Sequence, residues 1–323
     1  MTLKLYNNCR LGGVHMSDIR KLTCSDSHVL YFHAWIPEGN QVKAVLHLLH
    51  GMAEYSQRYE RFATHLNKQG IALYAQDHRG HGLTATKAEE TLGWFAQEDG
   101  WKRVAEDSME LSNLIVSEYP KKPLFLMGHS MGSFLARTII ADTPDLYDGV
   151  IMMGTGASMG ILGKIGGMIA RSHVKKRGSK FVDVQLNKMS FGSYNKKIPD
   201  AQSAFAWLSR DEKEVRKYDD DPLCGFVCTA KFFEDMLEGI GYANSIERAK
   251  RLHNDLPILI ISGSMDPVGN YGKGLQKVEE FYKQAGIEDL TLHLVDGARH
   301  ELLNETDRTS TMKYLISWLM DRV

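Results

Sequence analysis

Short apolar runs alternate along the chain with stretches in which apolar residues recur at helical spacing. The runs are nearly continuous, which is typical of strands buried on both faces of a parallel sheet. They predict strands at residues 44–49, 71–76, 124–127, 150–153, 257–261 and 290–295. The stretches between them predict helices at 58–69, 101–119, 131–142, 275–284 and 301–320. Two further runs, 19–24 and 28–36, predict an antiparallel pair because a polar turn separates them. Strands that alternate with helices indicate an α/β fold with a mostly parallel central sheet flanked by helices.

The alternation stops between residues 158 and 245, where the pattern becomes helical, interrupted by glycine and rich in charge. A chain of 323 residues also exceeds the usual size of one domain. We therefore predict a core formed by residues 19–157 and 246–323, with a mainly helical cap (lid) inserted at 158–245. Two independent domains are the alternative. Residues 1–18 show no clear period and predict a loose N-terminal extension.

The pentapeptide Gly128-His129-Ser130-Met131-Gly132 lies between a predicted strand and a predicted helix. It matches the G-x-S-x-G pattern, in which a sharp turn holds a serine in a strained conformation and the glycines allow close backbone approach. Such a turn exposes the hydroxyl at the carboxyl end of the sheet, at a helix N-terminus that favours developing negative charge. Ser130 is therefore the candidate nucleophile.

A serine hydroxyl needs a positioned base, and two other strand ends supply candidates. His300 follows the last predicted strand, and Asp266 follows the strand before it. The order Ser, Asp, His is that of the α/β-hydrolase fold, and open α/β sheets place their sites at strand ends. We predict a catalytic triad of Ser130, Asp266 and His300. Asp296 is a rival for the acid, but it lies only four residues before His300 and is expected to shape the loop.

The oxyanion hole requires backbone N–H groups rather than particular side chains. Met131 directly follows the nucleophile and Met52 lies in the loop after the 44–49 strand, so their amides are the predicted donors. His50 is expected to pack that loop rather than to act in catalysis. The chemistry requires no cofactor and no metal, and the two histidines within residues 77–82 are expected to belong to a tight structural loop.

The composition is that of an ordinary globular protein, with 43% apolar residues, 24% charged residues and a formal net charge of −1. This balance gives no global reason to bind nucleic acid or a membrane, so any such contact must be local. Four cysteines without metal-ligand spacing predict free thiols in a reducing compartment. Because the chain also lacks an N-terminal signal pattern and a long apolar run, we expect a cytoplasmic protein.

Several motifs resemble the monoacylglycerol lipase and lysophospholipase-like branch of the α/β-hydrolases, which is also grouped with serine aminopeptidases. The resemblance runs from about residue 19 to the C-terminus and is carried by the Ser130 turn, residues 77–82, His50-Gly51-Met52-Ala53-Glu54 and Arg58-Tyr59. Residues 207–211, 221–226, 266–269 and 297–301 resemble bacterial members. The second oxyanion residue varies in this branch, so the resemblance implies Met52 by backbone position only. Glu54 and Arg58 are expected to order the oxyanion loop, with contact to a polar substrate head as the alternative.

The cap has a basic half and an acidic half. Residues 158–197 hold nine Lys or Arg and one acid, whereas residues 198–245 hold five basic and ten acidic residues. In the basic half, one helical face opposite Lys164, Arg171 and Lys175 gathers Ile161, Leu162, Ile165, Met168 and Ile169. Such a helix fits an acyl tunnel, a peripheral membrane contact, or a cap helix that buries its stripe on the core.

We predict a serine hydrolase that cleaves small or lipid-derived carboxylic esters through an acyl-enzyme on Ser130, with monoacylglycerols or lysophospholipids as leading substrates. No nucleic-acid partner is expected, and the oligomeric state is left open. An aminopeptidase or amidase with the same triad is one alternative, in which Asp219, Asp220 or Asp221 holds the substrate ammonium. A catalytically silent ligand-binding module is another, although an intact triad argues against it.

Overall fold

One mixed sheet organises the protein, and the computed structural model describes it over residues 17–323. Its eight strands follow the order β1-β2-β4-β3-β5-β6-β7-β8. Their bounds are β1 Asp18–Thr23, β2 Val29–Trp35, β3 Ala44–Leu49, β4 Ile71–Gln76, β5 Leu124–His129, β6 Gly149–Met153, β7 Ile258–Gly263 and β8 Leu290–Val295. The pairs β1–β2 and β2–β4 are antiparallel, and the pairs from β4 to β8 are parallel. The predicted α/β fold with a mostly parallel sheet is confirmed.

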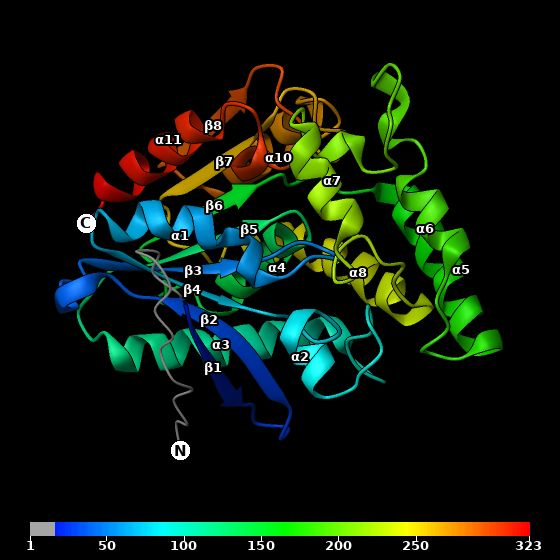
Figure 1. Cartoon of the computed structure of the whole chain (residues 1–323), viewed down its shortest axis with the longest axis horizontal. Coiled ribbons are helices and arrows are strands. Elements are labelled where there is room, and N and C mark those ends of the chain that lie inside the picture. Colours follow the sequence, from blue (N-terminus) through cyan, green and yellow to red (C-terminus); the bar gives the residue numbers. More distant parts are fainter. Residues whose placement is uncertain (1–16) are drawn as a thin grey trace.

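Helices cover both faces of this sheet (Figure 1). Those that follow strands of the sheet are α1 Glu60–Asn67, α2 Gly82–Lys87, α3 Gly100–Glu118, α4 Met131–Asp142, α10 Lys273–Ala285 and α11 Arg308–Met320. Apolar residues of α1 and α11 pack on one face, and those of α3, α4 and α10 pack on the other. Successive strand residues point to opposite faces, so Leu46 and Leu48 of β3 join the first cluster while Val45 and Leu49 join the second. Burial on both faces explains why the strands appear in the sequence as continuous apolar runs.

The chain between β6 and β7 leaves the sheet and carries further helices, of which the first four lie on the right of Figure 1. These are α5 Gly160–Arg177, α6 Val184–Phe191, α7 Glu212–Asp220, α8 Ala230–Ala243 and α9 Ile246–Ala249. Short 3₁₀ helices η3 Tyr194–Lys197 and η4 Ala206–Leu208 lie between α6 and α7. Helix α8 packs on α3 and α4, and α5 packs on α8. We call residues 158–245 the cap, and the division into core and cap stays a prediction.

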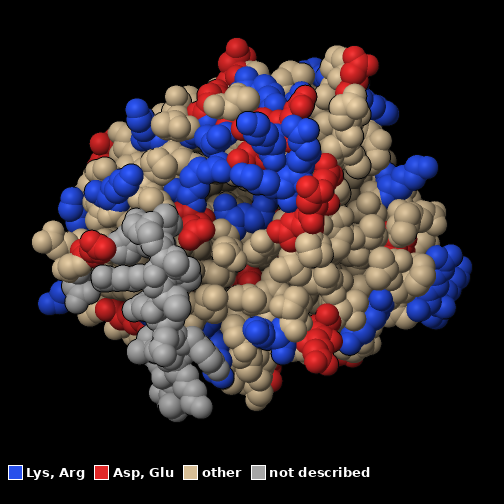
Figure 2. All heavy atoms as spheres, in the orientation of Figure 1, with Lys and Arg blue, Asp and Glu red and all other residues tan. Residues whose placement is uncertain are grey.

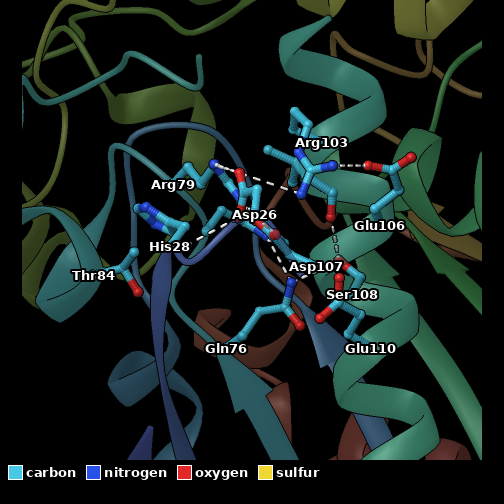
Figure 3. A network of polar contacts seen from close by, with 12 residues as sticks. Asp26, His28, Gln76, Arg79, Thr84, Arg103, Glu106, Asp107, Ser108 and Glu110 are labelled. Atoms are coloured by element: carbon cyan, nitrogen blue, oxygen red, sulfur yellow. Dashed lines mark hydrogen bonds and ion pairs between the residues drawn. The ribbon is translucent and has the colours of Figure 1, made fainter. Parts of the chain in front are cut away.

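A polar network, buried at Arg79 and Asp107, fixes the loop that follows β4 (Figure 3). Arg79 of this loop donates to both carboxylate oxygens of Asp107 on α3, at 2.6 and 2.7 Å. It also reaches Asp26 in the turn between β1 and β2 at 2.9 Å. The loop is therefore tied to two other elements, and its His81 accepts a hydrogen bond from the Ala53 amide at 3.2 Å. This is the tight structural loop that the sequence predicts.

Most predicted boundaries shift by one or two residues in the structure, and two differences bear on the site or the domain division. The extension predicted at residues 1–18 lies outside the described residues except for its last two, and Asp18 already begins β1. The helix predicted at 301–320 begins only at Arg308, after a 3₁₀ turn η5, Leu302–Asn304. The reason is Glu305, which is buried and accepts hydrogen bonds from the Arg299 amide and from Arg210. Over residues 17–323, none of the helices has both the length and the apolar character needed to cross a bilayer.

Candidate active site

Ser130 occupies the turn between β5 and α4 with φ 52° and ψ −118°, a backbone conformation that is strained for a residue with a side chain. Its amide donates to the Met153 carbonyl at 2.9 Å. A Cβ at Gly132 would lie 2.1 Å from the Leu49 carbonyl oxygen, and a Cβ at Gly128 would lie 2.1 Å from the Gly132 oxygen. Only glycine fits at these two positions, which is why the turn can close tightly around the serine.

A buried hydrogen bond of 2.9 Å joins His300 Nδ1 to Asp266 Oδ2. Asp266 also accepts from the Ser262 hydroxyl at 2.6 Å and from the Val268 amide at 2.8 Å. The rival Asp296 is exposed and does not bond to the imidazole. The structure therefore brings Asp266, and not Asp296, to His300.

Asp266 is held in its ionised form. Burial acts to raise the pKa of its carboxyl, but the neighbouring His300 and the three hydrogen bonds outweigh burial and lower the pKa below its usual value. The other nitrogen of the imidazole, His300 Nε2, is buried and has no hydrogen-bond partner among the described residues. Ser130 and His300 line the same cavity. A hydrogen bond between catalytic groups, such as one between Ser130 and His300 Nε2, often forms only when substrate is bound.

The loop after β3 presents the Met52 amide between two amides that are already bonded. The Gly51 amide donates to Glu54 Oε1 at 2.7 Å, and the Ala53 amide donates to a histidine ring of the loop after β4. Within residues 17–323 the Met52 amide has no such acceptor. Met131 begins α4, where the first amides of a helix have no partner inside the helix. Both predicted donors are therefore free to bind an anionic oxygen.

One buried network links this loop to the rest of the site. Arg58 donates to Glu54 at 2.6 Å and, through two nitrogens, to Glu301 at 2.7 Å each. Glu54 also accepts from the Tyr59 hydroxyl and from His129 Nδ1, both at 2.9 Å. Because His129 precedes Ser130 and Glu301 follows His300, the network connects the loop after β3 with the segments that carry these two residues. The sequence assigned the ordering of this loop to Glu54 and Arg58, whereas Glu301 stood there only within the 297–301 motif and had no role.

Burial and neighbouring charges act in opposite directions on the pKa values of Glu54 and His129. Burial acts to raise the pKa of Glu54, but Arg58 and His129 outweigh it and hold that pKa well below its usual range. Burial acts to lower the pKa of His129, but the hydrogen bond and charge of Glu54 outweigh it and raise that pKa. The paired charges keep the loop before Arg58 in one arrangement, as expected for residues that order an oxyanion loop.

A cavity of about 180 Å³ lies where the cap meets these loops. Its lining includes Ser130, His300, Met52, Phe191, Phe205, Trp207, Tyr218 and Phe226. The aromatic wall comes from the cap, and the Tyr218 hydroxyl donates to the Ala53 carbonyl at 2.8 Å. Asp219, Asp220 and Asp221, the sequence's candidates for an ammonium site, do not line this cavity. Asp221 instead accepts from the Tyr55 hydroxyl at 2.7 Å.

The sheet, the elbow serine and the cap-covered cavity at the strand ends are those of an α/β-hydrolase, and the protein is an enzyme of the serine hydrolase class. Residues 40–307 match the model of the family described as "Serine aminopeptidase, S33" (Hydrolase_4). The chain belongs to this family.

Curated relatives and solved structures agree with this membership. A monoglyceride lipase of Mus musculus is 26% identical over 314 residues, which cover 96% of this chain and 93% of the relative. A monoacylglycerol lipase of Mycolicibacterium smegmatis is 25% identical over 297 residues, which cover 91% and 94%. A thermostable carboxyl esterase of Bacillus coagulans has a TM-score of 0.87 at 23% identity, with 100% of both chains covered. A soluble variant of the Saccharomyces cerevisiae monoglyceride lipase has a TM-score of 0.73 at 22% identity, with 95% of both chains covered.

Proposed function

We propose that the protein hydrolyses carboxylic esters through an acyl-enzyme on Ser130, and that monoacylglycerol-like lipids are its substrates. The observation that carries the proposal is the 2.9 Å bond between buried Asp266 and His300, which lines the same cavity as Ser130. The relatives described as monoglyceride and monoacylglycerol lipases support an ester as the substrate.

In this mechanism Ser130 Oγ attacks the acyl carbon while its proton passes to His300 Nε2. Asp266 orients the imidazole and stabilises its charged form. The Met52 and Met131 amides donate to the oxyanion, and loss of one such donor typically costs roughly 3–4 kcal/mol of transition-state stabilisation. The proton then moves from His300 to the leaving alcohol, and water repeats the sequence to release the acid.

The cavity wall favours an uncharged ester over a peptide with a free N-terminus. The two carboxylates that line it, Glu54 and Glu301, are both paired with Arg58. A substrate ammonium would have to displace that guanidinium from a buried pair, which is costly. A neutral glycerol head has no such requirement, and the charged head of a lysophospholipid meets no unpaired counter-charge in this lining. The lining therefore supports a monoacylglycerol over a peptide with a free N-terminus and over a lysophospholipid.

The volume of the cavity limits how much of an acyl chain it can enclose. Sites that enclose a drug-sized ligand usually measure roughly 300–1,000 Å³, whereas this cavity measures about 180 Å³. It fits an ester head with the first part of an acyl chain. A long chain must therefore extend past the aromatic wall of the cap.

The proposal includes a peripheral membrane contact through α5. Most of its stripe is not buried on the core: Ile161 is 76% exposed, Leu162 74% and Met168 63%, whereas Ile169 packs against it. In the space-filling view, the side of the molecule where α5 and α6 lie carries clusters of Lys and Arg beside a broad uncharged area (Figure 2). An apolar ridge flanked by basic residues suits the surface of an anionic lipid layer.

We also propose that the enzyme works in the cytoplasm. Cys24, Cys224 and Cys228 are buried and unlinked, which suits a reducing compartment. Fractionation of cells that express the tagged chain tests this location, and recovery outside the cytoplasm contradicts it.

A fluorophosphonate probe tests the nucleophile, because it reacts with activated serines. The wild type is expected to be labelled and Ser130→Ala is not. Absence of labelling in the wild type would indicate a silent ligand-binding module. A panel of p-nitrophenyl esters, monoacylglycerols, lysophospholipids and aminoacyl amides then tests the substrate class, and faster turnover of the amides would favour the aminopeptidase.

A further inference from the structure

Two aromatic rings contact the imidazole of His300. The ring of Trp207, in η4 of the cap, has its centroid 4.9 Å from that of His300 with an interplanar angle of 44°. The ring of His129, at the end of β5, lies at 4.8 Å and 42°. The core thus provides one contact and the cap provides the other.

The backbone of the same cap segment holds the loop of His300. The His300 amide donates to the Trp207 carbonyl at 3.4 Å, and the Glu301 amide donates to the Leu208 carbonyl at 2.7 Å. The Arg299 guanidinium donates to two further carbonyls of this segment at 2.7 and 2.8 Å. A movement of η4 would therefore move the histidine loop as well.

The indole of Trp207 is itself fixed. Its ring lies edge-on to Tyr194 at 4.9 Å and parallel to Phe191 at 6.2 Å. Its amide donates to Asn195 Oδ1 at 2.9 Å, and the residue is only 7% exposed. The ring therefore keeps its orientation towards the imidazole before substrate binds.

We propose that Trp207 is a positioning residue for His300, and that its indole stabilises the imidazolium formed when Nε2 accepts the Ser130 proton. A cation within about 6 Å of a tryptophan ring is attracted by the electron-rich face, whereas a neutral imidazole gains much less. The contact therefore acts more strongly on the transition state than on the resting enzyme, which raises kcat. The inference rests on the proposed function, since it requires His300 to be the base.

Other titratable or charged groups lie around His300 and are retained in every Trp207 variant. Asp266 bonds to its Nδ1, His129 contacts its ring, and Arg299 and Glu301 adjoin it in the chain. Behind them, Glu54 bonds to His129, and Tyr194 of the cap interacts electrostatically with Asp266. A comparison of Trp207 variants in the whole enzyme therefore isolates the contribution of the indole.

The test compares Trp207→Leu and Trp207→Phe by pH profiles of kcat and kcat/KM on p-nitrophenyl acetate and p-nitrophenyl octanoate. Leucine keeps water out but has no ring, so kcat should fall about 3- to 30-fold on both esters. The midpoint of the rising limb should move to lower pH by about half a unit or more, because the imidazolium loses its proton more readily. Phenylalanine keeps a ring and should recover most of both effects.

Phe226→Leu is the matched control. Phe226 lines the same cavity, but its ring lies against His81 and not against Trp207 or His300. Its loss should change the ratio of octanoate to acetate turnover and leave the midpoint in place. If Trp207→Leu does not fold, Trp207→Met serves in its place, because methionine adapts to irregular space.

A midpoint that stays or moves to higher pH in Trp207→Leu, or a loss limited to the octanoate, would overturn the inference and make Trp207 a pocket wall only. Failure of the proposed function looks different. In that case the wild type itself is not labelled by the fluorophosphonate, or its rate shows no rising limb.

Discussion

Arg58 binds Glu301 through two parallel hydrogen bonds of 2.7 Å, although the two residues are 243 positions apart in the chain. The same guanidinium holds Glu54, so the oxyanion loop and the histidine loop share one buried cation. Both carboxylates are almost fully buried, at 2% and 5% exposure. The geometry of the site therefore depends on a residue that takes no part in the chemistry.

Arg58→Ala should destabilise the protein and abolish most of its activity. Removal of one partner from a buried ion pair leaves uncompensated charge and typically costs about 3–5 kcal/mol. Urea unfolding measures the loss, and hydrolysis of p-nitrophenyl acetate measures the activity. The matched control is Arg61→Ala, because Arg61 pairs with Glu214 while 37% exposed and such pairs contribute about 0–1 kcal/mol. Equal losses in the two variants would contradict this account.

The strain at Ser130 predicts a stability gain on removal of its side chain. Ser130→Gly and Ser130→Ala should both be inactive, but glycine relieves a positive φ that typically costs about 1–3 kcal/mol. The greater flexibility of glycine in the unfolded chain subtracts about 0.4–1 kcal/mol. The free energy of unfolding should therefore be about 1 kcal/mol higher for the glycine variant than for the alanine variant. A less stable glycine variant would mean that the turn is not strained.

Asp266→Asn should reduce kcat by several orders of magnitude, because the amide favours the wrong imidazole tautomer. Asp296→Asn serves as its control, since Asp296 is exposed and bonds only to Ser264, at 3.3 Å. Steady-state kinetics on a soluble ester compare the two. Severe loss in Asp296→Asn with normal activity in Asp266→Asn would reverse the assignment of the acid.

Much of this site follows from local sequence. The elbow is recognisable because its glycines must flank the serine within one strand-to-helix turn, and Asp266 and His300 lie at strand ends that topology brings together. Position along the chain therefore predicts Ser130, His300 and Asp266 as the candidate nucleophile, base and acid, without any knowledge of contacts.

The roles of Trp207 and Glu301 in the site could not be predicted from position along the chain. Their importance depends on which segments pack against the histidine loop, and no spacing within the cap encodes that contact. The late start of α11 has the same cause, since Glu305 is drawn inward by Arg210 of the cap and cannot continue a helix from the histidine loop. Local patterns predict elements, whereas tertiary contacts decide where these elements end.

The pH dependence of stability should carry the signature of Asp235, on α8. Burial raises the pKa of this carboxyl to about 6, and the hydrogen bond from Lys231 at 2.8 Å only partly offsets burial. Because the pKa is about 3.9 in the unfolded chain, the folded state binds more protons between about pH 4 and pH 6. The free energy of unfolding should therefore fall as pH rises through this window, by up to about 3 kcal/mol.

Asp235→Asn removes this titration, so its stability relative to the wild type should increase from pH 4 to pH 7. Urea unfolding across that range measures the difference. A wild type that gains stability from pH 4 to pH 7 relative to Asp235→Asn would contradict the prediction.

The membrane contact of α5 predicts a substrate-dependent effect of its basic end. Lys175, Lys176 and Arg177 form the last turn of α5, beyond the exposed apolar ridge. Each basic residue near an anionic surface contributes about 1 kcal/mol, and the effect falls off within a Debye length of about 8 Å at physiological salt. Replacement of all three by glutamine should therefore weaken binding to anionic vesicles roughly a hundredfold at low salt. Vesicle sedimentation measures this binding.

The same variant should hydrolyse vesicle-borne monoacylglycerol more slowly. It should hydrolyse a short soluble ester at nearly the wild-type rate, because Ser130, Asp266 and His300 are unchanged. Lys213, Arg216 and Lys217 on α7 provide a control set of equal charge in the acidic half of the cap. Their replacement should leave vesicle binding largely intact. Equal losses on both substrates would mean that the basic turn supports the fold of the cap. If the wild type does not bind anionic vesicles at low salt, the membrane contact is wrong, and the enzyme takes its esters from solution.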